Sequence, residues 1–308
     1  MTRSGPAALA LGFALVASVA ISVGMGAVPL TPGEIVGAFR GVGSDTARTI
    51  VLELRLPRAL LAVLVGGGLA LAGAVFQAML RNPLAEPYIL GISGGAAVGA
   101  VSVLALGLTT VGSWALPLAS FAGALAAIVL VFGVARRADR SMDVRVLLLS
   151  GVVVGAFFSA VIALILSLSE ASVVRSAVLW MMGSLAAAEW RSVLVVGGYT
   201  LPAALLLLGL ARPLNLLSLG EETATVLGAD VERVKVYAFG IASLLTAAGV
   251  GVAGVIGFVG LVVPHGVRLV TGSDHRSLLP LSFLAGGAFL ALADVVARTV
   301  VAPGELPI

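Results

Sequence analysis

Long apolar runs, free or nearly free of charged residues, constrain this chain more than any other feature of its sequence. Seven of them can cross the hydrocarbon core of a bilayer, which takes about 20 helical residues. They lie at Pro6–Leu30, Ala59–Leu80, Tyr88–Val111, Trp114–Ala135, Val146–Leu168, Ser192–Ala211 and Ser277–Ala297. Only 11% of all residues are charged, against about 25% in soluble domains. The sequence predicts an all-α, polytopic transmembrane helical bundle, and excludes a soluble enzyme and a nucleic-acid-binding module.

An eighth run, Val236–Gly272, is too long for a single crossing. At about 1.5 Å per residue, a straight helix of this length would extend well beyond a hydrocarbon core roughly 30 Å thick. Glycines punctuate the run, so we expect two helices joined near Gly249–Gly254, the second of them short. This division brings the expected total to nine spans. The segment Ala177–Ala188 is too short to cross, and we expect it at the outer surface or as a re-entrant segment.

The basic residues predict how the bundle is oriented. With the N-terminus in the cytoplasm, 11 of the 18 Lys and Arg residues fall on the cytoplasmic side and 7 on the outer side, as the positive-inside rule favours. The first run exceeds the 7–15 apolar residues that are usual in a cleavable signal peptide, so we expect an uncleaved first span.

The absence of cysteine excludes disulfides and thiolate metal sites.

The sequence lacks the short motifs that mark most catalytic sites. The single lysine, Lys235, does not close a phosphate-binding loop, and there is neither a His-Glu-x-x-His pattern nor a Gly-x-Ser-x-Gly elbow. We therefore expect no catalysis, bound cofactor or metal in this chain. His265 and the pair Met181–Met182 fit packing better than metal ligation, because a metal site recruits several donors. Asp294 is the main acid inside a predicted span, whereas proton-coupled pumps place series of acids there.

Short polar motifs interrupt the apolar background in a fixed order along nearly the whole chain. They are Arg55–Arg58, Arg81–Pro87, Leu90–Ala96, Trp180–Leu185, Leu219–Gly228, Gly257–His265, Asp274–Arg276, Ala293–Arg298 and Glu305–Ile308. Each motif alone is weak, but their joint order and spacing are specific. In this respect the chain resembles the FecCD-type permeases of bacterial ATP-binding-cassette importers for iron-siderophores, haem and cobalamin.

The resemblance implies a type II importer permease of ten helices that forms a dimer with a second copy or a paralogue. Two ATP-binding subunits, which hold ATP and Mg²⁺, would lie below it, and an extracytoplasmic substrate-binding protein would dock outside. The permease, a single domain over residues 1–308, would be no enzyme itself and would reside in the bacterial cytoplasmic membrane.

Two further points qualify this expectation. About nine spans are expected here instead of ten, because the family's last helix follows the motif Glu305–Ile308, where the given sequence stops. The alternative function is a secondary transporter or channel that acts without an ATPase partner. Broken, glycine-rich helices such as those expected in Val236–Gly272 also occur in secondary transporters.

Three arginines, Arg55, Arg58 and Arg298, fall at the predicted outer ends of spans. The resemblance implies that they hold acidic residues of the binding protein, and planar guanidinium groups suit bidentate pairing with carboxylates. The residues alone fit interfacial anchoring or helix orientation equally well.

The largest cytoplasmic loop, residues 212–235, contains a stretch with a glycine at each end and acids in its expected first helical turn, where acids suit the helix dipole. The resemblance implies that this short helix fits a cleft on the ATPase and couples the two subunits. A solvated helix with capping acids is the alternative. The coupling residues are Leu219, Gly220, Glu221, Glu222, Leu227 and Gly228.

A proline-containing turn ends the second span at the cytoplasmic face, since proline stops a helix and restricts the residue before it. The resemblance implies a cytoplasmic gate here, with a second half in the loop before the Val146–Leu168 run. Simple helix termination is the alternative for both. The gate residues are Asn82, Pro83, Leu84, Ser141 and Met142.

Overall fold

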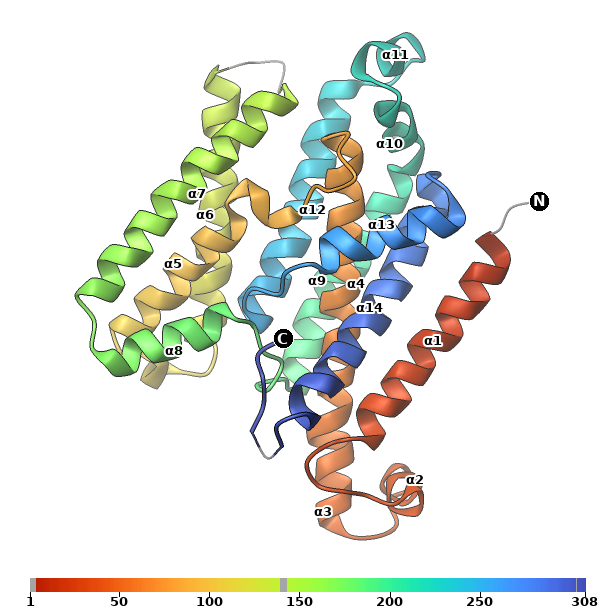
Figure 1. Cartoon of the computed structure of the whole chain (residues 1–308), viewed down its shortest axis with the longest axis vertical. Coiled ribbons are helices and arrows are strands. Elements are labelled where there is room, and N and C mark those ends of the chain that lie inside the picture. The colour runs from red at the N-terminus through yellow and green to blue at the C-terminus, as the bar shows by residue number, and fades with distance from the viewer. Residues whose placement is uncertain (1–3, 139–142, 303) are drawn as a thin grey trace.

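The computed structural model describes residues 4–138, 143–302 and 304–308, and the regular elements in these ranges are all helical (Figure 1). The first half comprises α1 (Ser4–Gly24), α2 (Pro32–Arg40), α3 (Asp45–Arg48), the π-helical η1 (Thr49–Arg55), α4 (Leu56–Met79), the 3-10 turn η2 (Pro87–Leu90), α5 (Ile92–Ala105), the 3-10 turn η3 (Leu108–Val111), α6 (Ala115–Ala138) and α7 (Val144–Ser167). The second half comprises α8 (Ala171–Met181), α9 (Trp190–Gly209), α10 (Ala211–Ser218), α11 (Glu221–Val226), α12 (Val231–Ala253), α13 (Val259–Thr271) and α14 (His275–Thr299).

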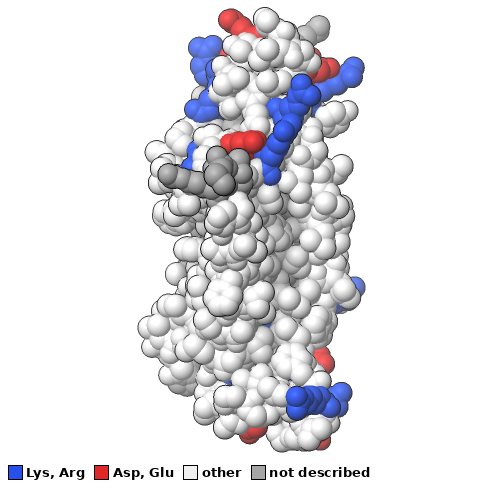
Figure 2. Space-filling view, turned by 90° about the vertical axis from the view of Figure 1, so that its right-hand side faces the viewer, with Lys and Arg blue, Asp and Glu red and all other residues white. Residues whose placement is uncertain are grey.

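Seven of the described helices are long and apolar enough to cross a membrane, and α5, α8 and α13 are shorter apolar helices. The predicted polytopic helical fold is confirmed. Helices α5 and α13 occupy the other two of the nine expected spans but are shorter than a full crossing needs. Charged side chains gather at the two ends of the face in Figure 2 and leave a broad uncharged belt between them. We call these the α11 end, which also carries α10, and the α2 end, which also carries α3 (Figure 1).

Helix α4 forms the centre of the bundle. It continues η1 without a break and packs against α9, α12, α13 and α14, so that 83% of its most apolar window is buried. Glycines allow two of these contacts: a Cβ atom on Gly66 would overlap the Gly286 carbonyl, and one on Gly73 would overlap the Gly260 carbonyl. Close backbone approach through small residues is the usual way in which membrane helices gain packing contacts.

Glycines also allow close packing between α5 and α6. Gly95 lies against the backbone of Gly123 and Gly99 against that of Ala119, so α5 and α6 are in close contact. The remaining α7 and α8 pack on the outside of this pair. In Figure 1 these four helices form one side of the molecule, and α4 with α9, α12, α13 and α14 forms the other.

Two of the predicted spans are interrupted. The run Val236–Gly272 divides as expected: α12 ends at Ala253, Gly254 adopts φ +72°, and α13 begins only at Val259. The run Tyr88–Val111 differs from the expectation of one full crossing, because its helix covers only Ile92–Ala105. Its ends are set by Gly91 and Gly107, whose φ values of +73° and +66° belong to the left-handed region that favours glycine.

Candidate functional site

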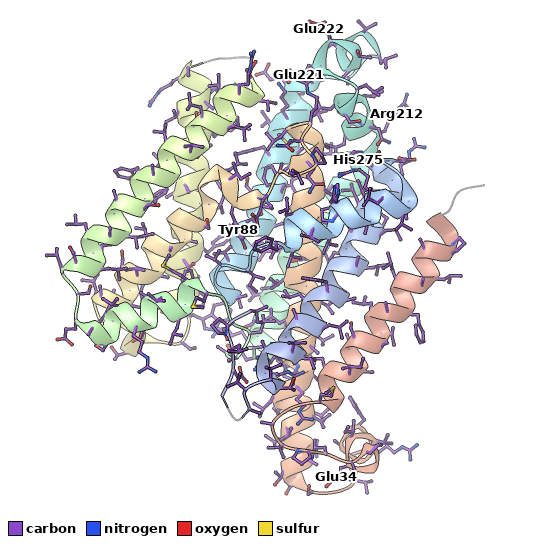
Figure 3. The ribbon with its side chains drawn as sticks, in the orientation of Figure 1. Glu34, Tyr88, Arg212, Glu221, Glu222 and His275 are labelled. Carbon is purple, nitrogen blue, oxygen red and sulfur yellow. The ribbon has the colours of Figure 1, made fainter. Side chains whose placement is uncertain are left out.

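The predicted coupling stretch forms a separate short helix at the α11 end. Helix α11 spans Glu221–Val226, with Gly220 (φ +116°) before it and Gly228 (φ +85°) after it. Both glycines adopt backbone conformations that a side chain would strain, which explains why the helix is confined between them. The predicted helix between Gly220 and Gly228 is confirmed as a local structure. Figure 3 shows Glu221 and Glu222 at this extremity of the molecule.

Apolar side chains are exposed around α11, beyond the uncharged belt. Leu219 is 65% exposed, Val226 86% and Leu227 55%. Glu222 is exposed beside them, whereas Ala224 turns inward and is buried. Exposed apolar residues that cluster with polar ones are typical of surfaces that bind another protein.

Glu221 is held differently from Glu222. Its carboxylate accepts a hydrogen bond from the Lys235 ammonium group at 2.6 Å, and Lys235 is 2% exposed near the start of α12. Nearby, Asp143 caps the first turn of α7. Hydrogen bonds from Arg145 lower the pKa of the Asp143 carboxyl to about 2, and the positive charge of Lys235 contributes to the decrease.

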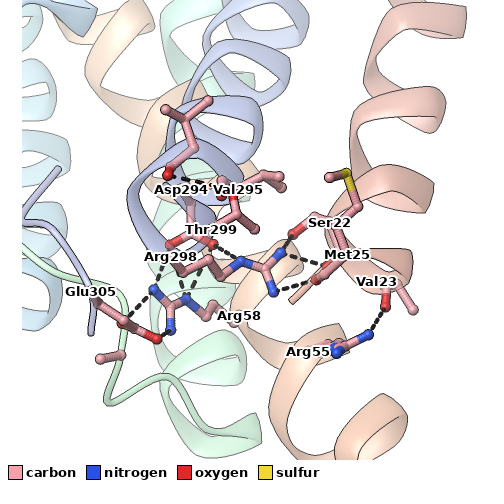
Figure 4. Close-up of polar contacts among 12 residues, drawn as sticks. Ser22, Val23, Met25, Arg55, Arg58, Asp294, Val295, Arg298, Thr299 and Glu305 are labelled. Atoms are coloured by element: carbon pink, nitrogen blue, oxygen red, sulfur yellow. Dashed lines mark hydrogen bonds and ion pairs between the residues drawn. The ribbon is translucent and has the colours of Figure 1, made fainter. Parts of the chain in front are cut away.

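The three predicted docking arginines lie together at the α2 end (Figure 4). Arg58 donates two hydrogen bonds to the Glu305 carboxylate, each at 2.9 Å, and pairs with Asp294 at 2.8 Å. Arg298 pairs with the same Asp294 at 3.2 Å. Its remaining nitrogens donate to oxygens of Ser22 and Met25 at the end of α1.

Arg55 donates hydrogen bonds to the carbonyl groups of Val23 and Gly24. Each of the three guanidinium groups therefore has partners within the chain, and together they join α1, α4 and α14. A cavity of about 280 Å³ lies beside them, lined by Arg55, Arg58, Arg298 and Glu305 among others. The arrangement orients helices, and it leaves one face of the Arg58–Glu305 pair accessible, since Glu305 is 38% exposed.

The predicted gate residues Asn82, Pro83 and Leu84 form an exposed turn at the α11 end of α4. The Asn82 side-chain oxygen accepts a hydrogen bond from the Leu84 amide at 2.9 Å, and Arg81 before it adopts φ +47°. The local geometry is that of a tight turn that ends α4. The other two gate residues, Ser141 and Met142, lie outside the described residues.

The sequence alone did not indicate a set of contacts where the two interrupted spans meet, midway along the bundle. The Glu86 carboxylate accepts from the Phe258 amide at 2.9 Å, and the Tyr88 hydroxyl accepts from the Ile256 amide at 3.3 Å. Gln77, which is buried, donates to the Leu261 carbonyl at 3.1 Å. Figure 3 places Tyr88 midway along the bundle. Pro87, which breaks the apolar run next to Glu86, was the available sequence signal.

The described residues contain no group of three or more His, Cys, Asp or Glu that could hold a metal ion. His275 is buried, and its Nδ1 atom lies 2.7 Å from the Asn215 side-chain oxygen. The Asn215 amide also donates to the Asp274 carboxylate at 2.7 Å. Hydrogen bonds from the Arg276 backbone amide and from Asn215 lower the pKa of the Asp274 carboxyl. The interaction joins α10 to the start of α14.

The fold and these sites define a polytopic helical membrane protein, with a short exposed helix, α11, at one end and an arginine cluster at the other. A model of the FecCD transport family matches residues 14–308. The chain belongs to this family.

Known relatives agree with this assignment over most of the chain. The cobalamin import system permease BtuC of Halobacterium salinarum is 46% identical over 82% of this chain and 68% of its own length. The hemin transport system permease HmuU of Yersinia pestis is 40% identical over 97% of this chain and 90% of its own length. A structure described as an inward-facing conformation of a metal-chelate type ABC transporter aligns with a TM-score of 0.87 and 32% identity, covering 97% of this chain and 92% of that chain.

Proposed function

We propose that the chain is the permease subunit of an ATP-binding-cassette importer that carries a metal chelate of the iron-siderophore, haem or cobalamin class into the cell. The names of the two relatives support this substrate class. The observation that carries the ATP-driven mechanism is α11: a short helix, bounded by two glycines, that presents Glu222 and exposed apolar residues at one extremity of the molecule.

In this proposal the chain pairs with a second copy or a paralogue, and two ATP-binding subunits cover the α11 end. ATP and Mg²⁺ bind to those subunits, which carry out the hydrolysis. The α11 end then faces the cytoplasm and the α2 end faces outward, in the cytoplasmic membrane. This orientation agrees with the larger number of basic residues assigned to the cytoplasmic side.

An extracytoplasmic substrate-binding protein would dock at the α2 end. Arg58 supports this part of the proposal, because its pairing with Glu305 is solvent-accessible and an acidic side chain of a partner can exchange with Glu305. Arg55 and Arg298 are buried at 5% and 6% exposure, so they would act mainly by holding the surrounding backbone. At the opposite end, Asn82, Pro83 and Leu84, with Ser141 and Met142, would close the pathway.

The coupling role of α11 is tested by reversing both of its acids, Glu221→Lys and Glu222→Lys. We expect the purified double variant to lose its ATP-binding subunits and ATP-dependent chelate uptake. The lysine at position 222 would face the ATPase cleft, the lysine at position 221 would repel Lys235, and both would oppose the helix dipole. The matched control is Glu232→Lys, an exposed acid on the adjacent helix, which should retain both. Unchanged uptake in the double variant would refute the coupling role, and chelate flux through the chain alone would favour a secondary transporter.

A further inference from the structure

Lys235 is an unusual residue in this chain. It is the only lysine, and it is 2% exposed although its partner Glu221 belongs to α11. Lysine is almost never fully buried unless its charge is paired. We therefore asked which groups pair with the buried ammonium group of Lys235 and which elements they connect.

The contact with α11 provides the first part of the answer. Helix α11 packs mainly against α10 and has few contacts with α12. The ion pair between Lys235 and Glu221, at 2.6 Å, is thus a principal connection between the short helix and the core of the bundle. Charge-assisted hydrogen bonds of this length are the stronger ones, and burial of the lysine stem limits its alternative rotamers.

The second part is the burial of the lysine within this ion pair. The Lys235 side chain is 2% exposed, whereas the Glu221 side chain is 34% exposed. The pair therefore has its cation inside the bundle, on α12, and its acid nearer the surface, on α11.

Helix α12, which carries Lys235, also reaches the interior of the bundle. It packs against α4, α6 and α9 and ends at Ala253, next to the unwound segment that meets Glu86 and Tyr88. A displacement applied to Lys235 acts on a helix whose far end adjoins the interrupted spans. Energetic coupling between distant sites requires such rigid, contiguous elements.

We propose that Lys235 is the positioning residue that passes movement of α11 to α12, by holding Glu221 through one buried charge. This inference rests on the proposed function, and it concerns how ATP hydrolysis is linked to transport. Lys235 contacts neither ATP nor the transported chelate in this role. Its loss should separate hydrolysis from uptake and leave the subunits assembled.

The test uses the complete importer in proteoliposomes, with the binding protein and either haemin or cyanocobalamin as the probe. The variant Lys235→Met keeps an unbranched apolar stem and removes the charge. We expect ATP hydrolysis to continue while uptake per ATP hydrolysed decreases about 5-fold or more, the usual lower range of coupling between two sites. The control is Arg233→Met. Arg233 lies two residues earlier, is 77% exposed and pairs with Asp230, so the uptake per ATP hydrolysed should not change in this variant.

A second variant protects the test against a folding defect in Lys235→Met. In Glu221→Gln the side chain keeps its length and its helix propensity, but the charge that pairs with Lys235 is removed. We expect the same decrease in uptake per ATP. An unchanged ratio in Glu221→Gln and in an assembled Lys235→Met would overturn the inference alone, whereas a wild-type complex that takes up neither probe would overturn the proposed function as well.

Discussion

Asp294 shows how this chain accommodates charge within a predicted span. Its side chain is fully buried in α14 and pairs with Arg58 of α4 and with Arg298 one turn further along α14. A buried carboxylate is costly unless it is paired and hydrogen-bonded, and here two guanidinium groups satisfy it. Arg58 also pairs with Glu305, which connects this buried network to the segment after α14.

We expect Asp294→Asn to destabilise the protein by about 3–5 kcal/mol, because it leaves two largely buried guanidinium groups without their shared counter-charge. Glu232→Gln provides the control. Its carboxylate is 58% exposed and lies 3.9 Å from Arg136, and such surface pairs contribute about 0–1 kcal/mol. Thermal unfolding in detergent compares the two variants. Equal midpoints would show that the buried network does not hold the helices together.

At the scale of single residues, the sequence located the arginines at one end of the predicted bundle, since each follows or precedes an apolar run. It did not identify their partners. Arg58 and Glu305 are 247 positions apart, and only the packing of α4 against α14 brings them together. The burial of Lys235 was equally invisible, because it depends on how α11 folds back over α12.

Among the elements, α4 depends on glycine for its central position. Gly66 and Gly73 allow the backbones of α14 and α13 to approach without an intervening side chain. In a membrane this close packing replaces much of the hydrophobic driving force that holds soluble helices together.

We therefore expect Gly73→Ala to destabilise the protein by about 1–3 kcal/mol, the usual range for overpacking a filled interior. Its new methyl group would meet the Gly260 carbonyl, which belongs to backbone and cannot rotate away. Gly133→Ala on α6 has open space around it and should be neutral or slightly stabilising, because alanine favours helix over glycine. Thermal unfolding in detergent again distinguishes them, and a neutral Gly73→Ala would contradict the close contact.

Helix boundaries were predicted well where proline or glycine interrupts an apolar run, as at the end of α12. They were predicted less well for α5. The left-handed conformations of Gly91 and Gly107 shorten this helix to Ile92–Ala105, whereas its apolar composition alone suited a complete crossing.

For the whole molecule, the uncharged belt and the two charged ends in Figure 2 predict that opposite ends are accessible from opposite sides of the membrane. The chain contains no cysteine, so single introduced cysteines report accessibility without a background.

In intact spheroplasts, a membrane-impermeant maleimide should label Arg40→Cys at the α2 end and should not label Arg233→Cys at the α11 end. After permeabilisation both should be labelled, because both side chains are exposed. The unmodified chain is the background control. The reverse pattern would show that the α11 end faces outward and would exclude cytoplasmic ATP-binding subunits as its partners.

The sequence by itself determined the class of fold, the approximate position of the apolar helices, and the short helix between Gly220 and Gly228. These properties depend on local composition. About 20 apolar residues are enough to cross a bilayer as a helix, and glycine or proline often marks the end of a helix. The tertiary structure alone decided which charges are buried and paired, as for Asp294 and Lys235. It also decided where the interrupted spans meet, because such contacts join residues far apart in sequence and depend on the packing of whole helices.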